Sequence, residues 1–259
     1  MIKKYGTVYG FLLGIISIFG AYLIEGGSLG ALFLIAPIII VFGGTFSATI
    51  IGFGFDKFKQ IFGLIKMAYF PRTYDLENLI NSFIEISIKS RKQGLLNIER
   101  DINLLEYLFP RKLIRYTVDG TESEELENLA LLEMRAMKDR HFSNMQIFTK
   151  MGSYAPTMGI LGTVMALIMT LAQAGGDPSL LIRSIATAFI ATLWGVLSAN
   201  LIWFPIADRL KKCHMEEKHM MQVALEGALG LQSGEIPSIL KARLISMLPQ
   251  KDQIKMLNS

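Results

Sequence analysis

The sequence predicts an all-α membrane protein with four transmembrane helices, a helical cytoplasmic domain between spans 2 and 3, and a helical C-terminal tail. Two observations lead to this fold class. Four long stretches contain no charged residue, and about 20 apolar residues let a helix cross a bilayer. Outside these stretches, apolar residues recur at helical spacing, and no segment alternates as a strand does.

The charge-free stretches locate the spans and divide the chain. The stretches cover residues 5–24, 26–55, 151–176 and 184–207. Within them we place the spans at about 5–24, 30–53, 154–174 and 184–206. The predicted parts are therefore a transmembrane hairpin at 1–55, a cytoplasmic helical domain at 56–150, a second hairpin at 151–207, and cytoplasmic C-terminal helices at 208–259.

Lys3 and Lys4 precede the first stretch, as the basic residues of a cleaved signal peptide would. However, the apolar run is long, and a second one follows after the short turn Glu25 to Ser28. No small-residue cleavage pattern lies between the two runs. We therefore expect an uncleaved hairpin of two spans.

The basic residues predict the orientation. Of the 26 Lys and Arg residues, 2 precede the first span, 15 lie in 56–150, and 8 follow residue 207. Only Arg183 lies in the short connections. By the positive-inside rule, both termini and the middle segment of this multi-pass chain are expected to be cytoplasmic.

The cytoplasmic segments are predicted to be helical. Asp75 can cap the helix that follows it, and Pro110 is expected to end the helix before it. The expected helices are 55–69 as a continuation of the second span, 76–92, 95–108, 123–150 running into the third span, 208–229 continuing the fourth, and one short helix after Pro237.

Composition argues against several functions. A net charge of +4 is too small to suggest a nucleic-acid binder, and one cysteine excludes a disulfide framework. A polytopic membrane enzyme remains an alternative, because the segment after the fourth span contains residue types that bind metals. They are Cys213, His214, Glu216, Glu217 and His219. Their basic neighbours favour a helix at the lipid headgroups instead. We expect no catalytic residue, no metal and no cofactor.

The four stretches also contain no Asp, Glu, Lys, Arg or His. Ionisable residues within a membrane usually mark proton relays and ion paths. This chain cannot carry a proton through a titrating group of its own. Transport would require a carboxylate from another chain, or water and hydroxyl groups alone.

The third and fourth spans each carry a face of small residues. They are Gly159, Thr163, Ala166, Thr170 and Ala174 in the third, and Ser184, Ala188, Thr192, Gly195 and Ala199 in the fourth. Such faces let helices approach closely in lipid. The two spans could pack against each other, or line a space for a partner helix with Thr163 and Thr192 as oxygen ligands for a cation.

Two prolines, Pro156 and Pro205, bracket this pair of spans on the predicted cytoplasmic side. A proline commonly marks a helix end, but inside a helix it removes a hydrogen bond and kinks the axis. Since both spans are expected to continue into the cytoplasm, these prolines can act as two hinges at one level.

Three motifs resemble those of the MotA family, the flagellar motor stator subunits of the MotA/TolQ/ExbB proton channel superfamily. The first is the run YAPTMGILGTVM from Tyr154 to Met165, and the second is AFIATLWG from Ala188 to Gly195. The third lies in the tail, at Leu225 to Gly227 and Gly234 to Pro237. The resemblance covers essentially the whole chain.

The resemblance implies a ring of five subunits around two copies of a single-span MotB-type partner, which supplies the ion-binding aspartate. Ion flow then rotates the ring, which turns the rotor through FliG. Pro156 and Pro205 match the family's coupling prolines, and Thr192 its channel threonine. Arg91 and Glu99 match the charged rotor contact, and Glu133 matches a further contact carboxylate.

From the residues alone, Arg91 and Glu99 would be an ordinary exposed pair. The transported ion also stays open. Sodium-type members often carry threonine at the position of Thr163, where proton-type members often carry alanine, yet a threonine can also hold water in a proton path. Our prediction is the proton, with sodium as the alternative. ExbB/TolQ-type energiser subunits are the other candidates, but they have three spans and an outside N-terminus.

Overall fold

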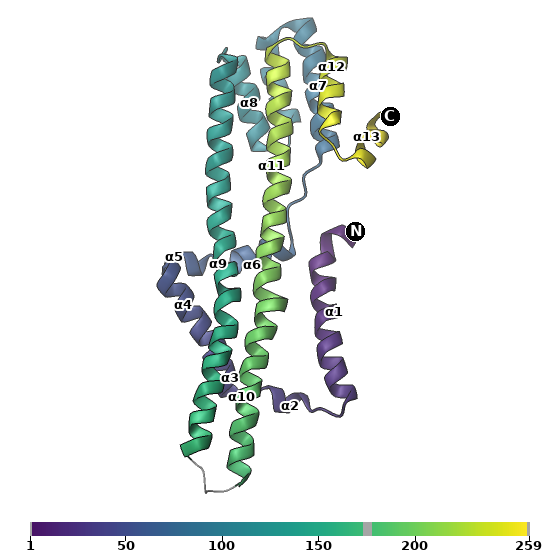
Figure 1. Cartoon of the computed structure of the whole chain (residues 1–259). Helices are drawn as coiled ribbons and strands as arrows, with labels where there is room; N and C mark the ends of the chain where they lie inside the picture. The colour runs from purple at the N-terminus through teal and green to yellow at the C-terminus, as the bar shows by residue number, and fades with distance from the viewer. Residues whose placement is uncertain (1, 173–177, 258–259) are drawn as a thin grey trace. The chain divides into compact units, whose positions relative to one another are not determined.

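The computed structural model describes residues 2–172 and 178–257. Within these ranges every regular element is a helix (Figure 1). Among the described residues, four helices are long and apolar enough to cross a membrane. The predicted all-α membrane fold is therefore confirmed. The predicted end of the third span, at residue 174, lies outside the described residues.

The chain forms two compact units. Unit 1 consists of Met1–Arg72 and His141–Cys213, and unit 2 of Thr73–Arg140 and His214–Ser259. Unit 1 holds the charge-free stretches of all four spans. Unit 2 holds most of the charged residues and a core of its own.

The first span, α1 (Ile2–Ile24), is followed by a short helix α2 (Leu29–Leu32). The second span starts at α3 (Ile35–Ile38) rather than at residue 30. Pro37 explains the break, because a helix continuing through it would clash with the carbonyl group of Phe33. The Trp194 indole donates a hydrogen bond of 2.8 Å to the carbonyl oxygen of Leu32 beside the break.

The second span then passes through a π-helical turn η1 (Ile39–Gly43) and α4 (Gly44–Phe53). The predicted continuous helix over 55–69 is wrong. Gly54 has φ +80°, a conformation that glycine adopts at little cost, and it separates α4 from the following helices. Those helices are α5 (Phe55–Lys59) and α6 (Ile61–Tyr69).

The third and fourth spans continue as helix beyond the apolar stretches, as predicted. Helix α9 (Ser123–Ala172) runs without interruption through Pro156. Helix α10 (Pro178–Ser198) leads through a second π-helical turn, η3 (Ala199–Trp203), into α11 (Phe204–Gln232). Figure 1 shows these as the long teal and green helices.

Unit 2 begins with α7 (Leu76–Gln93), and the predicted cap is present. The Asp75 Oδ1 atom accepts a 3.0 Å hydrogen bond from the Asn78 amide, a contact worth about 1 kcal/mol. The helix predicted over 95–108 is instead a 3₁₀ helix, η2 (Leu95–Leu104). It follows Gly94, which has φ +84°.

Pro110 begins a helix rather than ending one. It lies in the first turn of α8 (Leu108–Val118), where the amide that proline lacks would have no partner within the helix. The tail contains two short helices rather than one, α12 (Pro237–Ser246) and α13 (Gln250–Leu257). Phe83, Leu126 and Leu240 are fully buried in the core that joins these elements.

Candidate functional site

The hydroxyl groups of Thr163 and Thr192 meet between α9 and α10. Their Oγ1 atoms lie 2.6 Å apart. Thr163 Oγ1 also lies 3.1 Å from the carbonyl oxygens of Gly159 and Ala188. Both threonines are half-buried. The structure thus brings together the two residues predicted for the ion pathway, and it surrounds one hydroxyl with three oxygen atoms.

One turn away, the two helices approach each other closely at Gly159 and Gly195. A Cβ atom added at Gly159 would lie 2.9 Å from the carbonyl oxygen of Ala191. One added at Gly195 would lie 2.8 Å from the carbonyl oxygen of Ala155 and 3.2 Å from the Cα atom of Pro156. The small residues therefore pack the two spans against each other, which is the first of the two interpretations offered by their pattern.

A second face of α9 remains exposed. It carries large apolar side chains at spacings of three and four residues, namely Ile160, Val164, Leu167 and Leu171. This spacing places them along one side of the helix. In a membrane such a stripe contacts either lipid or a helix of another chain. The sequence pattern of small residues had not indicated it.

Both predicted coupling prolines lie inside continuous helix rather than at a helix end. Pro156 belongs to α9 and adjoins the crossing at Gly195. Pro205 is the second residue of α11, which continues the π-helical turn η3. Since a proline removes one backbone hydrogen bond of a helix, both positions are local weak points of long helices.

Arg91, at the C-terminal end of α7, contacts the tail. Its exposed side chain donates a 2.9 Å hydrogen bond from Nη2 to the carbonyl oxygen of Gly234. Gly234 has φ +64° and makes the turn between α11 and α12. Glu99 lies in η2, but its side chain is outside the described residues.

Glu133 forms an ion pair with a residue that the sequence did not single out. Its two carboxylate oxygens lie 3.0 and 3.1 Å from the Lys112 Nζ atom of α8. The side chains of Lys112 and Glu133 are 40% and 37% exposed. No spacing rule connects residues on separate helices, so the sequence offered no signal for this partner.

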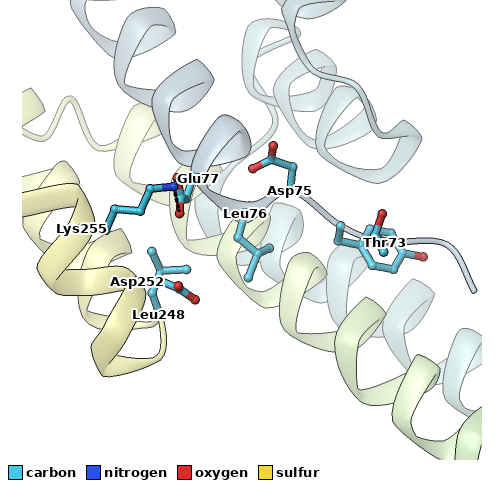
Figure 2. A pocket seen from close by; sticks show the side chains of 8 residues that line it. Thr73, Asp75, Leu76, Glu77, Leu248, Asp252 and Lys255 are labelled. Atoms are coloured by element: carbon cyan, nitrogen blue, oxygen red, sulfur yellow. Dashed lines mark hydrogen bonds and ion pairs between the residues drawn. The ribbon is translucent and has the colours of Figure 1, made fainter. Parts of the chain in front are cut away.

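A further ion pair joins the last helix to α7. Lys255 Nζ lies 2.9 and 2.6 Å from the two carboxylate oxygens of Glu77. Figure 2 shows this contact at the edge of an open pocket of about 410 Å³, with Asp75 and Asp252 nearby. The hydrogen bond to Glu77 raises the pKa of Lys255. The contact joins α13 to the start of α7.

The residues considered for a metal site lie along α11 after the fourth span. His214 is buried, and its Nδ1 atom lies 3.3 Å from the sulfur of Met137. Among the described residues, no three His, Cys, Asp or Glu side chains come together in an arrangement that could hold a metal ion.

Comparison with known proteins places the whole chain in one family. Residues 8–94 match the family model described as motility protein A N-terminal. Residues 100–223 match that of the MotA/TolQ/ExbB proton channel family. Motility protein A of Bacillus subtilis (strain 168) is 32% identical over 250 residues, which cover 96% of this chain and 92% of the relative.

Two solved structures share the fold over nearly the full length. The flagellar MotAB stator complex from Bacillus subtilis matches with a TM-score of 0.90 and 32% identity, covering 96% of this chain and 98% of that one. The structure of C. jejuni MotAB matches with a TM-score of 0.89 and 25% identity, covering 95% and 96%. Full-length identity above 30%, together with the same helical fold, shows that this chain belongs to the motility protein A family.

Proposed function

We propose that this chain is a flagellar motor stator subunit that conducts an ion and converts its flow into torque. The observation that carries the proposal is the pair of facing threonine hydroxyls, Thr163 and Thr192, in spans that contain no ionisable residue. Such spans offer oxygen ligands to an ion but no titrating group. In this proposal a second chain supplies the charge, and relatives of this chain are solved as complexes named MotAB.

The partner in this proposal is a MotB-type single-span subunit whose aspartate carries the ion. Several copies of this chain, five by family resemblance, would surround it. The exposed apolar stripe on α9 supports this arrangement, because it offers a helix-sized face beside the threonine pair. A polytopic enzyme is not proposed, since this family consists of ion-channel subunits.

The proposed route of coupling runs from the threonines to the charged unit 2. Pro156 and Pro205 would bend when the ion binds and leaves, because each lies inside a continuous helix. Arg91, Glu99 and Glu133 would contact the rotor protein FliG. Charged faces of this kind steer partners and set their register.

The proposed location is the bacterial inner membrane, with both termini in the cytoplasm. The distribution of Lys and Arg residues supports it, since 25 of the 26 lie on one side of the four spans. The match to the motility protein A N-terminal model, which covers both early spans, favours a stator over an energiser subunit of the ExbB/TolQ type.

A motility assay tests the function and the ion together. The chain is expressed with its MotB-type partner in a host that lacks stators, in sodium-free and in sodium-rich medium. We expect swimming in both media and its loss when a proton ionophore is added. Swimming that requires sodium would replace the proton with sodium, and failure to restore swimming in any stator-null host would contradict the stator function.

Replacing Thr163 by valine tests the hydroxyl pair. Valine keeps the shape of the side chain but removes the oxygen atom, at a stability cost of about 1 kcal/mol. We expect the complex to assemble while swimming speed falls severalfold. The control is Thr170→Val on the same helix, because that hydroxyl donates a 2.9 Å hydrogen bond to the carbonyl oxygen of Ala166, one turn earlier in α9. Equal speeds for the two variants would show that the Thr163 oxygen plays no part in conduction.

A further inference from the structure

Helix α1 contacts the rest of unit 1 through side chains near its middle. The Phe11 ring meets the edge of the Tyr69 ring, with centroids 6.4 Å apart. Further along, a Cβ atom added at Gly14 would lie 3.0 Å from the Leu201 side chain. Between and beside these contacts, α1 leaves two cavities against the fourth span, and Phe11 lines both of them.

The first cavity lies beside the start of α1 and combines apolar walls with two basic side chains, Arg209 and Lys212. It has a volume of about 530 Å³, and its lining includes Gly6, Thr7, Gly10, Tyr69, Arg209 and Lys212. The space next to α1 is empty at both glycines of this lining, since a Cβ atom added at Gly6 or Gly10 would meet no heavy atom within 4 Å.

The Arg209 guanidinium group has a donor without a hydrogen-bond partner among the described residues. Its Nε atom is buried, and no acceptor lies within reach of it among the described residues. A guanidinium group recognises phosphate especially well, because its donors match the geometry of the phosphate oxygens. Asp208 also lines this cavity, but Lys212 offsets its charge, and Lys3 and Lys4 precede Gly6 in the sequence.

The second cavity lies further along α1 and is apolar. Its volume is about 350 Å³, and it is lined by side chains such as Ile15, Phe19, Trp194, Leu197 and Ile202. These residues belong to the charge-free stretches. The two cavities therefore follow one another along α1 in the order basic and then apolar.

From this order we infer that the groove beside α1 binds one anionic phospholipid of the cytoplasmic leaflet. The phosphate group binds Arg209 and Lys212 at the basic end, and an acyl chain lies in the apolar cavity. Basic pockets between transmembrane helices on the cytoplasmic side bind anionic headgroups in this manner. The choice of leaflet rests on the proposed orientation. Pro205 lines the same basic cavity, so the bound lipid lies against a proposed hinge.

Native mass spectrometry of the full chain in complex with its partner subunit tests the site. The delipidated complex is titrated with phosphatidylglycerol and, separately, with phosphatidylcholine. We expect phosphatidylglycerol to bind more tightly at one site per chain. The double variant Arg209→Gln/Lys212→Gln should weaken this binding about thirtyfold, which is about 2 kcal/mol at roughly 1 kcal/mol per basic residue.

Two matched controls separate the site from general charge and from misfolding. Lys57→Gln/Lys59→Gln removes the same charge just after the second span, outside either cavity, and should leave binding unchanged. Gly10→Leu should fill the basic cavity and also displace the lipid. Gly20→Leu, on the same helix, points into space where no atom lies within 4 Å and should have no effect.

Several outcomes would overturn the inference. One is equal affinity for phosphatidylglycerol and phosphatidylcholine, and another is equal weakening by the lysine control. Competition by glycerol 3-phosphate at the affinity of the lipid would identify a soluble phosphate ligand instead. A photocrosslinker at Thr7 that joins two protein chains would assign the groove to a neighbouring subunit. None of these experiments measures motility. A negative result for lipid binding would therefore not contradict the proposed stator function.

Discussion

Gly195→Val is expected to abolish swimming while the chain still inserts into the membrane. The Cβ atom of the new side chain would lie 2.8 Å from the carbonyl oxygen of Ala155 and 3.2 Å from the Cα atom of Gly159. These are backbone atoms, so relief requires α9 and α10 to separate. Overpacking of this kind costs about 1–3 kcal/mol, and separation would also pull apart the hydroxyl groups of Thr163 and Thr192.

The measurement is colony expansion in soft agar, with the membrane level of each variant determined by immunoblot. Gly20→Val is the control, because it makes the same change in the first span where a Cβ atom meets nothing within 4 Å. It should swim like the unchanged protein. A Gly195→Val variant that swims normally at a normal membrane level would show that the close crossing is dispensable.

Arg91→Glu is expected to cut torque by at least about tenfold, because opposing like charges at an interface costs several kcal/mol. The substitution also removes the hydrogen bond to Gly234, an exposed contact worth about 1 kcal/mol or less. The fold of unit 2 should therefore survive. Torque is measured on tethered cells at high load and by swimming speed at low load.

Two further variants make this experiment specific. Arg91→Lys keeps the positive charge and should retain most of the torque of the unchanged protein. Lys92→Glu makes the same charge reversal at the adjacent exposed position and should have a much smaller effect. If Arg91→Glu cells show normal torque when tethered and normal speed when swimming, Arg91 does not belong to the rotor contact.

The spans could be predicted from the sequence because the absence of charge over 20 or more residues has a single physical explanation in a helical protein. The errors arose at single residues whose backbone behaviour depends on context. Gly54 adopts a positive φ that ends α4, although glycine is also tolerated within helices. Pro110 is expected from its position to end a helix, yet its missing amide suits the first turn of α8 equally well.

The candidate site was predictable as a set of residues but not as an arrangement. The small faces of the third and fourth spans identified Thr163 and Thr192, but their 2.6 Å contact depends on how two helices are rotated about their axes. The same holds for Glu133, whose partner Lys112 lies on a different helix. Contacts between separate elements are set by packing, and spacing along one sequence does not encode packing directly.

The π-helical turn η3 has a consequence for insertions and deletions in the fourth span. A π turn accommodates one residue more than an α-helical turn, and one residue corresponds to a rotation of about 100° around the axis. The turn at Ala199–Trp203 therefore sets the angular phase between Thr192 and Gly195 on one side and Pro205 and Arg209 on the other. Loss of a single residue within η3 would convert it into a regular α-helical turn and leave the later side chains close to their present faces. Loss of one residue elsewhere in the fourth span would instead turn every later side chain by about 100°.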